Sequence, residues 1–538
     1  MNQLRLGQCV GTVSSATFRR SHNESVIQSL GHRKDITFAW ARTEPESQSQ
    51  QDGNAGPAGG RGGGGLPPPY IAHQAGVNCL AIDGNEGRYL FSGGADSAIR
   101  LWDLEEHEPS SSPLSASRSS VLTKYTPKAT LSKSTPDSHT HALTSISIYP
   151  FDPTPSTLLT TSYDKTLKIT SITPSALNPV HTFSLDFLPY SHCLSSLPDS
   201  SPLIAVGTAH PAIRLLDLRS GLSTHSLAGP NGAVYSVCWS PKQSHILASG
   251  STDGRVLFYD IRRANAVFAS LDLDDAIGVI GASPTTGAGA RRELLDFNNA
   301  ALAHNGPVTS VQWSPTGDKI ITTGHDQRIR VWDAASGRND LVHYGPRIRN
   351  ERQGQLRPLI SPRGYHGVGQ EMLWWPNDDG RGMVFQHHLR EGNLVRILKT
   401  EGIRVSDAQR ASAKKGSSNK GGPSGGSGSN VARLTSGGRI NAMVWRLSAP
   451  VGEGIEMYTA HGDGRICSWM PPRTPEEADD NDESGAPAGS TWAAEPSNNN
   501  GETTTLVLGD EAEQRKKRKR DLVEDLISGL TKKPITFS

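Results

Sequence analysis

The sequence has few cysteines and lacks any long apolar run. Its five cysteines form no Cys-x-x-Cys pair, and three lie on or beside expected strands, so we expect buried thiols rather than zinc ligands or disulfides. Buried thiols fit a reducing compartment. No apolar run is long enough to span a bilayer, and the opening MNQLRLGQCV is too polar for a signal peptide. The cysteines are Cys9, Cys79, Cys193, Cys238 and Cys467.

An excess of charge of one sign is also absent, and so are the short motifs of catalysis. The formal net charge is +1, so whole-molecule charge gives no argument for nucleic-acid binding. There is no GxxxxGK[ST] loop, no GxSxG and no HExxH, and the glycine-rich run at 59–65 follows no expected strand. Only the adjacent His387 and His388 hint at a metal site, and the hint is weak. We therefore expect no enzyme activity, no cofactor and no bound metal.

What the sequence does contain is a repeat. A turn Asp is followed six residues later by an aromatic residue in most copies, and a second Asp often comes next. Apolar runs on both sides of the turn Asp predict two antiparallel strands joined by a tight turn. A further strand is expected before most copies, at residues 77–82, 143–148, 234–239 and 308–313. The spacings are Asp96–Trp102, Asp164–Thr170, Asp253–Tyr259, Asp326–Trp332 and Asp463–Trp469.

Small repeated sheets of this kind predict an all-β propeller. One such sheet cannot bury both of its faces, so neighbouring copies must pack radially. Six copies are legible, and one of them has His210 at the turn. A seventh is predicted near residues 372–385, where Asp379 stands six residues before Phe385. We therefore expect a seven-bladed propeller over residues 70–470.

The last blade needs a closing strand, because the sequence after Trp469 becomes polar. Residues 35–43 could supply that strand from the N-terminal side, since Ile36, Phe38 and Trp40 alternate as one buried face. Closure of this kind would leave no open sheet edge.

The repeat resembles the WD-repeat family, which has four strands in each blade. The resemblance implies a buried structural network in which a loop His, the turn Asp, a Ser or Thr and the strand Trp meet, and a third expected loop histidine is His141. A His and an Asp near a Thr could also suggest a catalytic triad, but the set recurs in several blades whereas catalysis needs one. The two complete sets are His73, Asp96 and Trp102, and His304, Asp326 and Trp332.

Low-complexity segments interrupt the repeat and follow it. Their polar, Gly-rich or Ser-rich composition cannot bury enough apolar surface to fold alone, so we expect disordered insertions and tails. These segments are 44–69, 106–123, 272–292, 403–436 and 471–538.

The C-terminal tail carries a dense basic run and then an apolar stripe at helical spacing. The basic run predicts nuclear import, and an ordinary solvated charge run is the alternative. The stripe predicts a short amphipathic helix that either binds a partner or packs on the propeller. The basic residues are Arg515, Lys516, Lys517, Arg518, Lys519 and Arg520, and the stripe contains Leu522, Val523, Leu526, Ile527 and Leu530.

Longer strings resemble one branch of WD-repeat proteins, the Cockayne syndrome group A family, in a fungal-type form. They lie at residues 76–105, 190–221, 234–264 and 303–345, and phrases such as YSH and LVHYG are not general WD-repeat features. The resemblance is weak over residues 346–439, and the glycine-rich insertion and the basic tail depart from the family pattern.

This resemblance implies a non-catalytic substrate receptor of a cullin–RING ubiquitin ligase that acts in transcription-coupled nucleotide excision repair. Such a receptor bridges a damaged-DNA-binding-protein adaptor to stalled RNA polymerase II and its repair factors in the nucleus. It uses no membrane and no direct sequence-specific nucleic-acid binding. The resemblance also implies that residues 1–34 form a helical adaptor-docking segment, where Phe18, Val26 and Ile27 look similar.

The family further implies adaptor docking through a WDxR box at the end of a strand. Here Asp260 and Arg262 occupy that box, with Tyr259 in place of Trp, and Asp217 and Arg219 form a degenerate copy. Arg262 would present a fixed guanidinium fork to acidic or carbonyl groups. The alternative is that Asp260 caps its own turn and Arg262 is an ordinary surface residue.

Two other functions stay open. A nuclear WD-repeat scaffold for ribosome biogenesis or chromatin would share the propeller and the basic tail. A nucleic-acid binder that uses residues 515–520 would show a steep salt dependence, lost when the tail is deleted.

Overall fold

Most of the chain between residues 2 and 471 is described by the computed structural model, with gaps at the low-complexity segments. The predictions for the basic run at 515–520 and for the apolar stripe after it lie outside the described residues. So do most of the five segments expected to be disordered. The described ranges are 2–40, 71–106, 108–109, 123–198, 202–263, 267–274, 301–351, 356–367, 369–400, 438–447 and 455–471.

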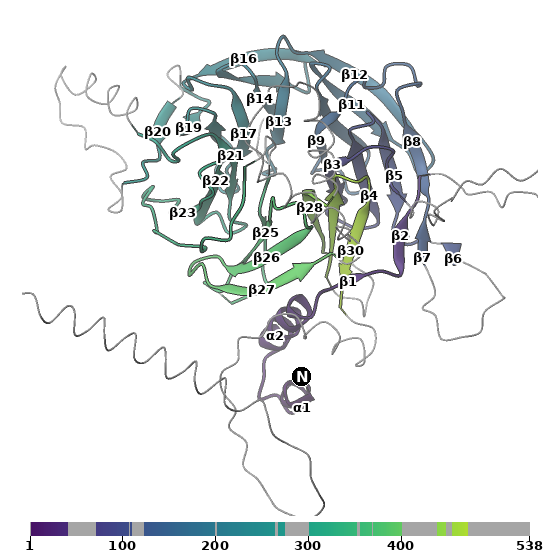
Figure 1. Ribbon diagram of the computed structural model, residues 1–538, viewed down its shortest axis with the longest axis vertical. Coiled ribbons are helices and arrows are strands. Elements are labelled where there is room, and N and C mark those ends of the chain that lie inside the picture. The colour runs from purple at the N-terminus through teal and green to yellow at the C-terminus, as the bar shows by residue number, and fades with distance from the viewer. Residues whose placement is uncertain are drawn as a thin grey trace, which may run out of the picture. The chain divides into compact units, whose positions relative to one another are not determined.

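Seven small antiparallel sheets lie around a central channel and form the blades of a β-propeller (Figure 1). The first strands of blades 7, 1, 2, 3, 4 and 5 pack side by side around this channel. Blade 1 consists of β3 (Val77–Ile82), β4 (Tyr89–Gly94), β5 (Ile99–Asp103) and β8 (Pro127–Leu131). Blade 2 consists of β9 (Leu143–Ile148), β10 (Thr157–Ser162), β11 (Thr166–Ile172) and β12 (Leu177–Ser184). Blade 3 consists of β13 (Pro189–Leu194), β14 (Leu203–Thr208), β15 (Ala212–Asp217) and β16 (Leu222–Ala228).

The remaining blades follow in chain order, and the N-terminal segment joins the last one. Blade 4 consists of β17 (Val234–Trp239), β18 (Ile246–Ser251), β19 (Val256–Asp260) and β20 (Val267–Ser270), and blade 5 of β21 (Val308–Trp313), β22 (Lys319–Gly324) and β23 (Ile329–Asp333). Blade 6 consists of β24 (Leu359–Ile360), β25 (Met372–Pro376), β26 (Met383–His388) and β27 (Leu394–Lys399). Blade 7 consists of β28 (Ile440–Arg446), β29 (Glu456–His461), β30 (Ile466–Met470) and β1 (Gly31–Arg33).

The constant spacing of the repeat has a local cause at each hairpin turn. In blade 1 the second and third strands pair from Tyr89 opposite Asp103 to Gly93 opposite Ile99. Asp96 lies in the turn between them and accepts the backbone N–H of Ala98 at 3.2 Å. Asp164, Asp253, Asp326 and Asp463 accept the N–H two residues later in the same way, at 3.1–3.2 Å. Asp is favoured there because its carboxylate completes the turn.

The strands predicted before the repeat units are confirmed with their bounds, as β3, β9, β17 and β21. The seventh copy is also present, as blade 6. There Asp379 lies in the turn between β25 and β26 and accepts the N–H of Arg381 at 2.9 Å.

The hydrophobic core lies between neighbouring blades. Trp102 and Leu90 of blade 1 pack in one cluster with Tyr458 of blade 7, while Trp332 of blade 5 packs in another with Phe258 of blade 4. Each blade therefore depends on its neighbour to cover its apolar face, and the ring is stable only when it is complete.

The strand that closes blade 7 comes from the N-terminal side, but the predicted residues were wrong. β1 pairs antiparallel with β30, with Gly31 opposite Met470 and Arg33 opposite Ser468. The predicted segment, 35–43, follows a turn instead, and its residues 36–38 form β2 (Ile36–Phe38) in a separate sheet. Alternation showed correctly that Ile36 and Phe38 are buried, but the third member, Trp40, is 36% exposed. Alternation also carries no information about which strand pairs with these residues.

The separate sheet extends the seam between blades 1 and 7. β2 pairs parallel with β7 (Thr123–Tyr125), which pairs antiparallel with β6 (Glu108–Pro109). Phe38 stacks on Tyr125 at a centroid distance of 5.0 Å and meets Trp102 and Tyr458 edge-on at 5.3 and 6.0 Å. The chain that enters the ring is thus held by apolar contacts with both blades.

Two helices precede β1: α1 (Asn2–Val10) and α2 (Ser15–Gln28). Ser14 caps α2 by accepting the N–H of Thr17 at 3.1 Å. Figure 1 shows both helices outside the ring, with α2 near β1 and β27 and α1 farther out. Within the described residues, neither helix is long and apolar enough to cross a membrane.

Candidate partner-docking surfaces

Two blades contain the complete buried network predicted from the sequence. In blade 5, His304 pairs through Nδ1 with Asp326 at 2.9 Å and through Nε2 with Thr322 at 2.8 Å. Trp332 Nε1 donates to the same Thr322 oxygen at 2.8 Å. In blade 1, His73, Asp96, Ser92 and Trp102 repeat these contacts at 2.7–2.9 Å.

The electrostatics of this network favour a neutral histidine and a charged aspartate. Burial lowers the pKa of His304, partly offset by Asp326. Burial alone would raise the pKa of Asp326, but the hydrogen bond from His304 and the charge of Arg330 lower it well below its usual range. Arg330 lies 2.7 Å from Asp326, so the carboxylate is paired twice. His304 and Trp332 are fully buried, and this arrangement holds the blade together and presents nothing to a substrate.

Three of the other five blades keep part of this set. In blade 2 the histidine is His139, which pairs with Asp164 at 2.8 Å and Thr160 at 2.9 Å, and not the predicted His141. In blade 4, Ser249 donates to the hydroxyl of Tyr259 at 3.4 Å. In blade 7, Thr459 accepts from Trp469 at 3.1 Å and bonds to His461 at 2.9 Å.

The two faces of the propeller are distinguished by the ends of the strands. We call the face that carries the turn aspartates, such as Asp96, the turn face. We call the opposite face, where the third strand of each blade ends, the strand-end face. It carries Asp103, Asp217, Asp260, Asp333 and, in blade 7, Met470.

On the strand-end face, Asp260 holds Arg262 in one orientation. The Nε and Nη2 atoms of Arg262 donate to the two carboxylate oxygens at 3.0 and 2.9 Å, and its backbone N–H donates at 3.1 Å. The side-chain bond from Arg262 lowers the pKa of Asp260 to about 2. Asp260 is 4% exposed whereas Arg262 is 62% exposed, so a buried carboxylate fixes a guanidinium that faces solvent. Asp260 therefore caps its turn and positions Arg262 at the same time.

A second exposed cation lies on the same carboxylate. Arg263 approaches Asp260 to 3.3 Å and is 64% exposed. The end of blade 4 therefore presents two guanidinium groups on one buried anion.

The degenerate box at the end of blade 3 is not built this way. Asp217 accepts the backbone N–H of Arg219 at 2.9 Å, which lowers the pKa of Asp217. No side-chain bond from Arg219 to Asp217 is present in this described segment. The structure brings Asp217 and Arg219 together only through the backbone.

The other strand-end aspartates bind cations that are less exposed. Asp103 pairs with Arg88 at 2.8 Å, and Arg88 is 35% exposed. Asp333 lies 3.4 Å from Lys319, which is 11% exposed and also pairs with Asp340. Blade 4 thus differs from these blades because its strand-end aspartate holds strongly exposed arginines through their side chains.

The N-terminal helices join the propeller from the same face. Gly31 of β1 lies opposite Met470, so the chain leaving α2 reaches blade 7 at the strand-end face. Ile27 and Leu30 are fully buried in a cluster with Trp374 of blade 6 and with Met457 and Trp469 of blade 7. In α1, by contrast, Leu6 and Val10 are 66% and 69% exposed and lie one helical turn apart. α2 is anchored while α1 presents an apolar stripe to solvent.

No cluster of three or more potential ligands for a metal ion occurs in the ranges given above. Sequence reasoning located Asp260 and Arg262 but missed the exposed stripe on α1. The spacing of Leu6 and Val10 is a signal that could have found it.

The comparisons with known proteins agree with this architecture. Residues 68–103, 130–171, 221–260 and 299–333 match the family of the WD domain, G-beta repeat. The chain is a WD-repeat protein, and its repeats form a seven-bladed β-propeller, a fold that commonly serves as a non-catalytic scaffold.

Two kinds of relative are found. The WD repeat-containing protein ATCSA-1 of Arabidopsis thaliana is 29% identical over 340 residues, which cover 54% of this chain and 73% of that protein. The ribosome biogenesis protein ytm1 of Aspergillus clavatus is 30% identical over 276 residues, 48% of this chain and 52% of that protein. The ytm1 protein of Emericella nidulans is 28% identical over 349 residues, 62% of this chain and 64% of that protein. The chain therefore spans 73% of the first relative but less than two thirds of the other two.

Proposed function

We propose that this protein is a non-catalytic substrate receptor of a cullin–RING ubiquitin ligase that acts in transcription-coupled nucleotide excision repair in the nucleus. The observation that carries the proposal is the strand-end face, where a buried Asp260 fixes an exposed Arg262 and where the anchored α2 carries the exposed α1. The similarity to ATCSA-1 over 73% of that protein supports it.

The geometry suits attachment to an adaptor without rearrangement. Arg262 uses Nε and one Nη for Asp260, so its other edge is available for a carboxylate or carbonyl group of the damaged-DNA-binding-protein adaptor. Because the orientation is fixed beforehand, little side-chain entropy is lost on binding. Leu6 and Val10 would bury apolar surface against the same adaptor.

A rigid ring then separates the two partners. The adaptor would occupy the strand-end face, and RNA polymerase II with its repair factors would bind elsewhere on the propeller. Loops on a rigid scaffold are the usual place for such contacts.

The test is capture of the adaptor and the cullin from nuclear extract by the tagged full-length protein. Deletion of residues 1–40 would be a poor variant, because it removes β1 and the buried Phe38. A double substitution, Leu6→Asp with Val10→Asp, changes only exposed positions of α1. The matched control is Val180→Asp, a position 66% exposed within β12, the outer strand of blade 2, and away from the strand-end face.

The proposal predicts that the wild type and the control recover adaptor and cullin, while the α1 variant loses most of both. Recovery of neither partner by the wild type would refute the proposed function. Equal recovery by all three proteins would refute the role of α1.

The second candidate is a scaffold in ribosome biogenesis, favoured by the similarity to the ytm1 proteins. It predicts that the protein sediments with pre-ribosomal particles in a sucrose gradient. Sedimentation with such particles, combined with no recovery of the adaptor, would decide for this candidate.

A further inference from the structure

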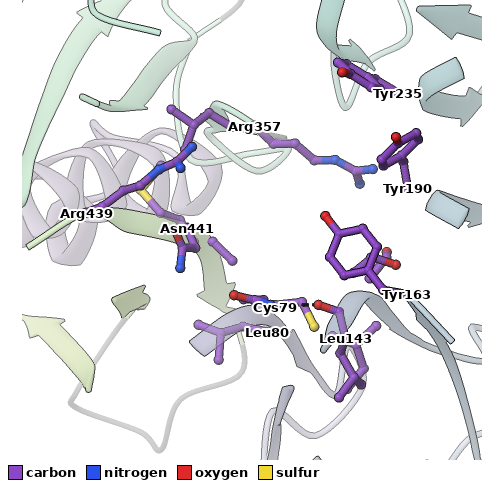
Figure 2. Close-up of a pocket in the computed structure, with 16 residues that line it drawn as sticks. Cys79, Leu80, Leu143, Tyr163, Tyr190, Tyr235, Arg357, Arg439 and Asn441 are labelled. Atoms are coloured by element: carbon purple, nitrogen blue, oxygen red, sulfur yellow. Dashed lines mark hydrogen bonds between the residues drawn. The ribbon is translucent and has the colours of Figure 1, made fainter. Parts of the chain in front are cut away.

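A cavity of about 560 Å³ lies in the central channel, and the proposed function makes no use of it (Figure 2). Its walls are the first strands of blades 1, 2, 3, 4 and 7, together with the segment that leads into β24. Most of these residues lie where the first strands begin, so the cavity belongs to the turn face. Its volume falls in the range of small-ligand sites.

The charged groups that line the cavity are two arginines, with no carboxylate in the lining. Arg439 lies 3.3 Å from Asp378, whose side chain is fully buried behind it, so its charge is compensated. Arg357 differs, because its Nη2 atom is buried and has no hydrogen-bond partner in the part of the chain that is described. A buried guanidinium nitrogen without an acceptor is costly, and the rest of this partly exposed side chain lines the cavity, where an anion would offset its charge.

Three tyrosines from consecutive blades face Arg357. Figure 2 shows its guanidinium extending toward Tyr190, with Tyr163 and Tyr235 on either side. The rings of Tyr190 and Tyr235 meet at 4.9 Å and 75°. Burial raises the pKa of Tyr163 and of Tyr235, so their hydroxyl groups stay protonated and can donate hydrogen bonds.

The hydrogen-bond donors of Arg357 and of the three tyrosines therefore lie along one side of the cavity. An aromatic cage for a quaternary ammonium group would use the rings in another way, but the positive charge of Arg357 beside the rings opposes a cation. We propose that the turn-face cavity binds an anionic group, a carboxylate or a phosphate, carried by a peptide segment of a partner protein.

A peptide fits these observations better than a nucleic acid does. Nucleic-acid sites neutralise a series of phosphates with several cations along a groove. Here one uncompensated guanidinium lies within an enclosed ring of strands. One anionic side chain that enters from the turn face matches this single charge. The inference is independent of ligase docking, which uses the opposite face.

The experiment measures binding of fluorescent peptides to the full-length protein by anisotropy at low and physiological salt. Three peptides share one neutral backbone and carry glutamates, phosphoserines or lysines at the same positions. A short single-stranded DNA is the fourth probe. The test variants are Arg357→Gln and the smaller change Tyr190→Phe. The control is Arg381→Gln, an exposed arginine of blade 6 that does not line the cavity. Circular dichroism and thermal melting check that each variant folds.

We expect the glutamate or the phosphoserine peptide to bind and the lysine peptide not to bind. Arg357→Gln should weaken binding at least about tenfold and Tyr190→Phe severalfold, while Arg381→Gln stays within about twofold. Binding of phosphoserine alone would identify the source of the anion as phosphate, and binding of both peptides would identify an acidic segment. Failure of both anionic peptides at millimolar concentration would overturn the inference. Equal weakening by Arg357→Gln and Arg381→Gln, or tighter binding of the DNA that Arg357→Gln abolishes, would also overturn it.

Discussion

Replacement of Thr322 by Val removes one hydroxyl from the centre of the blade 5 network. The Oγ1 atom of Thr322 lies 2.8 Å from both His304 Nε2 and Trp332 Nε1, and all three residues are fully buried. Val has nearly the same shape, so the substitution opens no cavity. It leaves two buried polar groups without their partner.

The cost follows from those two groups. Each buried donor or acceptor left unsatisfied destabilises a protein by about 1–3 kcal/mol, so we expect Thr322→Val to lower the free energy of unfolding by roughly 2–6 kcal/mol. The matched control is Thr130→Val on β8, the outer strand of blade 1. Thr130 is exposed, so its replacement should cost less than about 0.5 kcal/mol.

The assay is unfolding in guanidinium chloride, followed by tryptophan fluorescence and far-ultraviolet circular dichroism. Coincidence of the two transitions is required before a free energy is extracted. Trp332→Phe and the double variant complete a mutant cycle, which should give a coupling energy of about 1 kcal/mol or more. A loss below about 0.5 kcal/mol for Thr322→Val, or additive effects of the two substitutions, would refute the network as a source of stability.

Three further predictions concern the same framework. The folded-state pKa of His304 is lowered from 6.5 and that of Asp326 from 3.8. The stability that these two groups contribute is therefore full at neutral pH and falls as the pH drops below about 6.5 and again below about 4. A melting temperature that rises on acidification would contradict this. Gly324→Ala should unfold blade 5 locally, because the new methyl group would lie 2.6 Å from His304 Nδ1. The control is Gly84→Ala, whose methyl group would meet nothing within 4 Å. The melting temperature should therefore fall for Gly324→Ala and not for Gly84→Ala. Leu30→Ala should cost about 2–5 kcal/mol of packing and expose the N-terminal segment to limited proteolysis, with the exposed Leu6→Ala as the control; equal cleavage of both would contradict the anchor.

The repeat made the fold predictable because its cause is local. Each turn Asp accepts an N–H two residues later, so the spacing survives even where the aromatic has become Thr170. His139 was missed for His141, although His73, His139 and His304 all stand four residues before their strands. The constant interval of four residues between the loop histidine and the first strand of the blade would have identified His139.

Contacts between distant segments could not be predicted in this way. The pairing of Gly31 with Met470 joins opposite ends of the described chain, and alternation of apolar residues specifies a face but no partner. The cavity is likewise assembled from single residues such as Tyr163, Tyr190 and Arg357 on different blades. The WDxR box was visible in the sequence, but the bidentate contact that fixes Arg262 was not.

The affinity of the purified full-length protein for the purified damaged-DNA-binding-protein adaptor tests the central claim most directly. The comparison is between the wild type, Arg262→Glu, and Arg381→Glu on the turn face as the control. The account predicts that Arg262→Glu weakens binding at least about tenfold while the control changes it less than about twofold. Unchanged affinity of Arg262→Glu, with its fold intact, would contradict the docking surface proposed for the strand-end face.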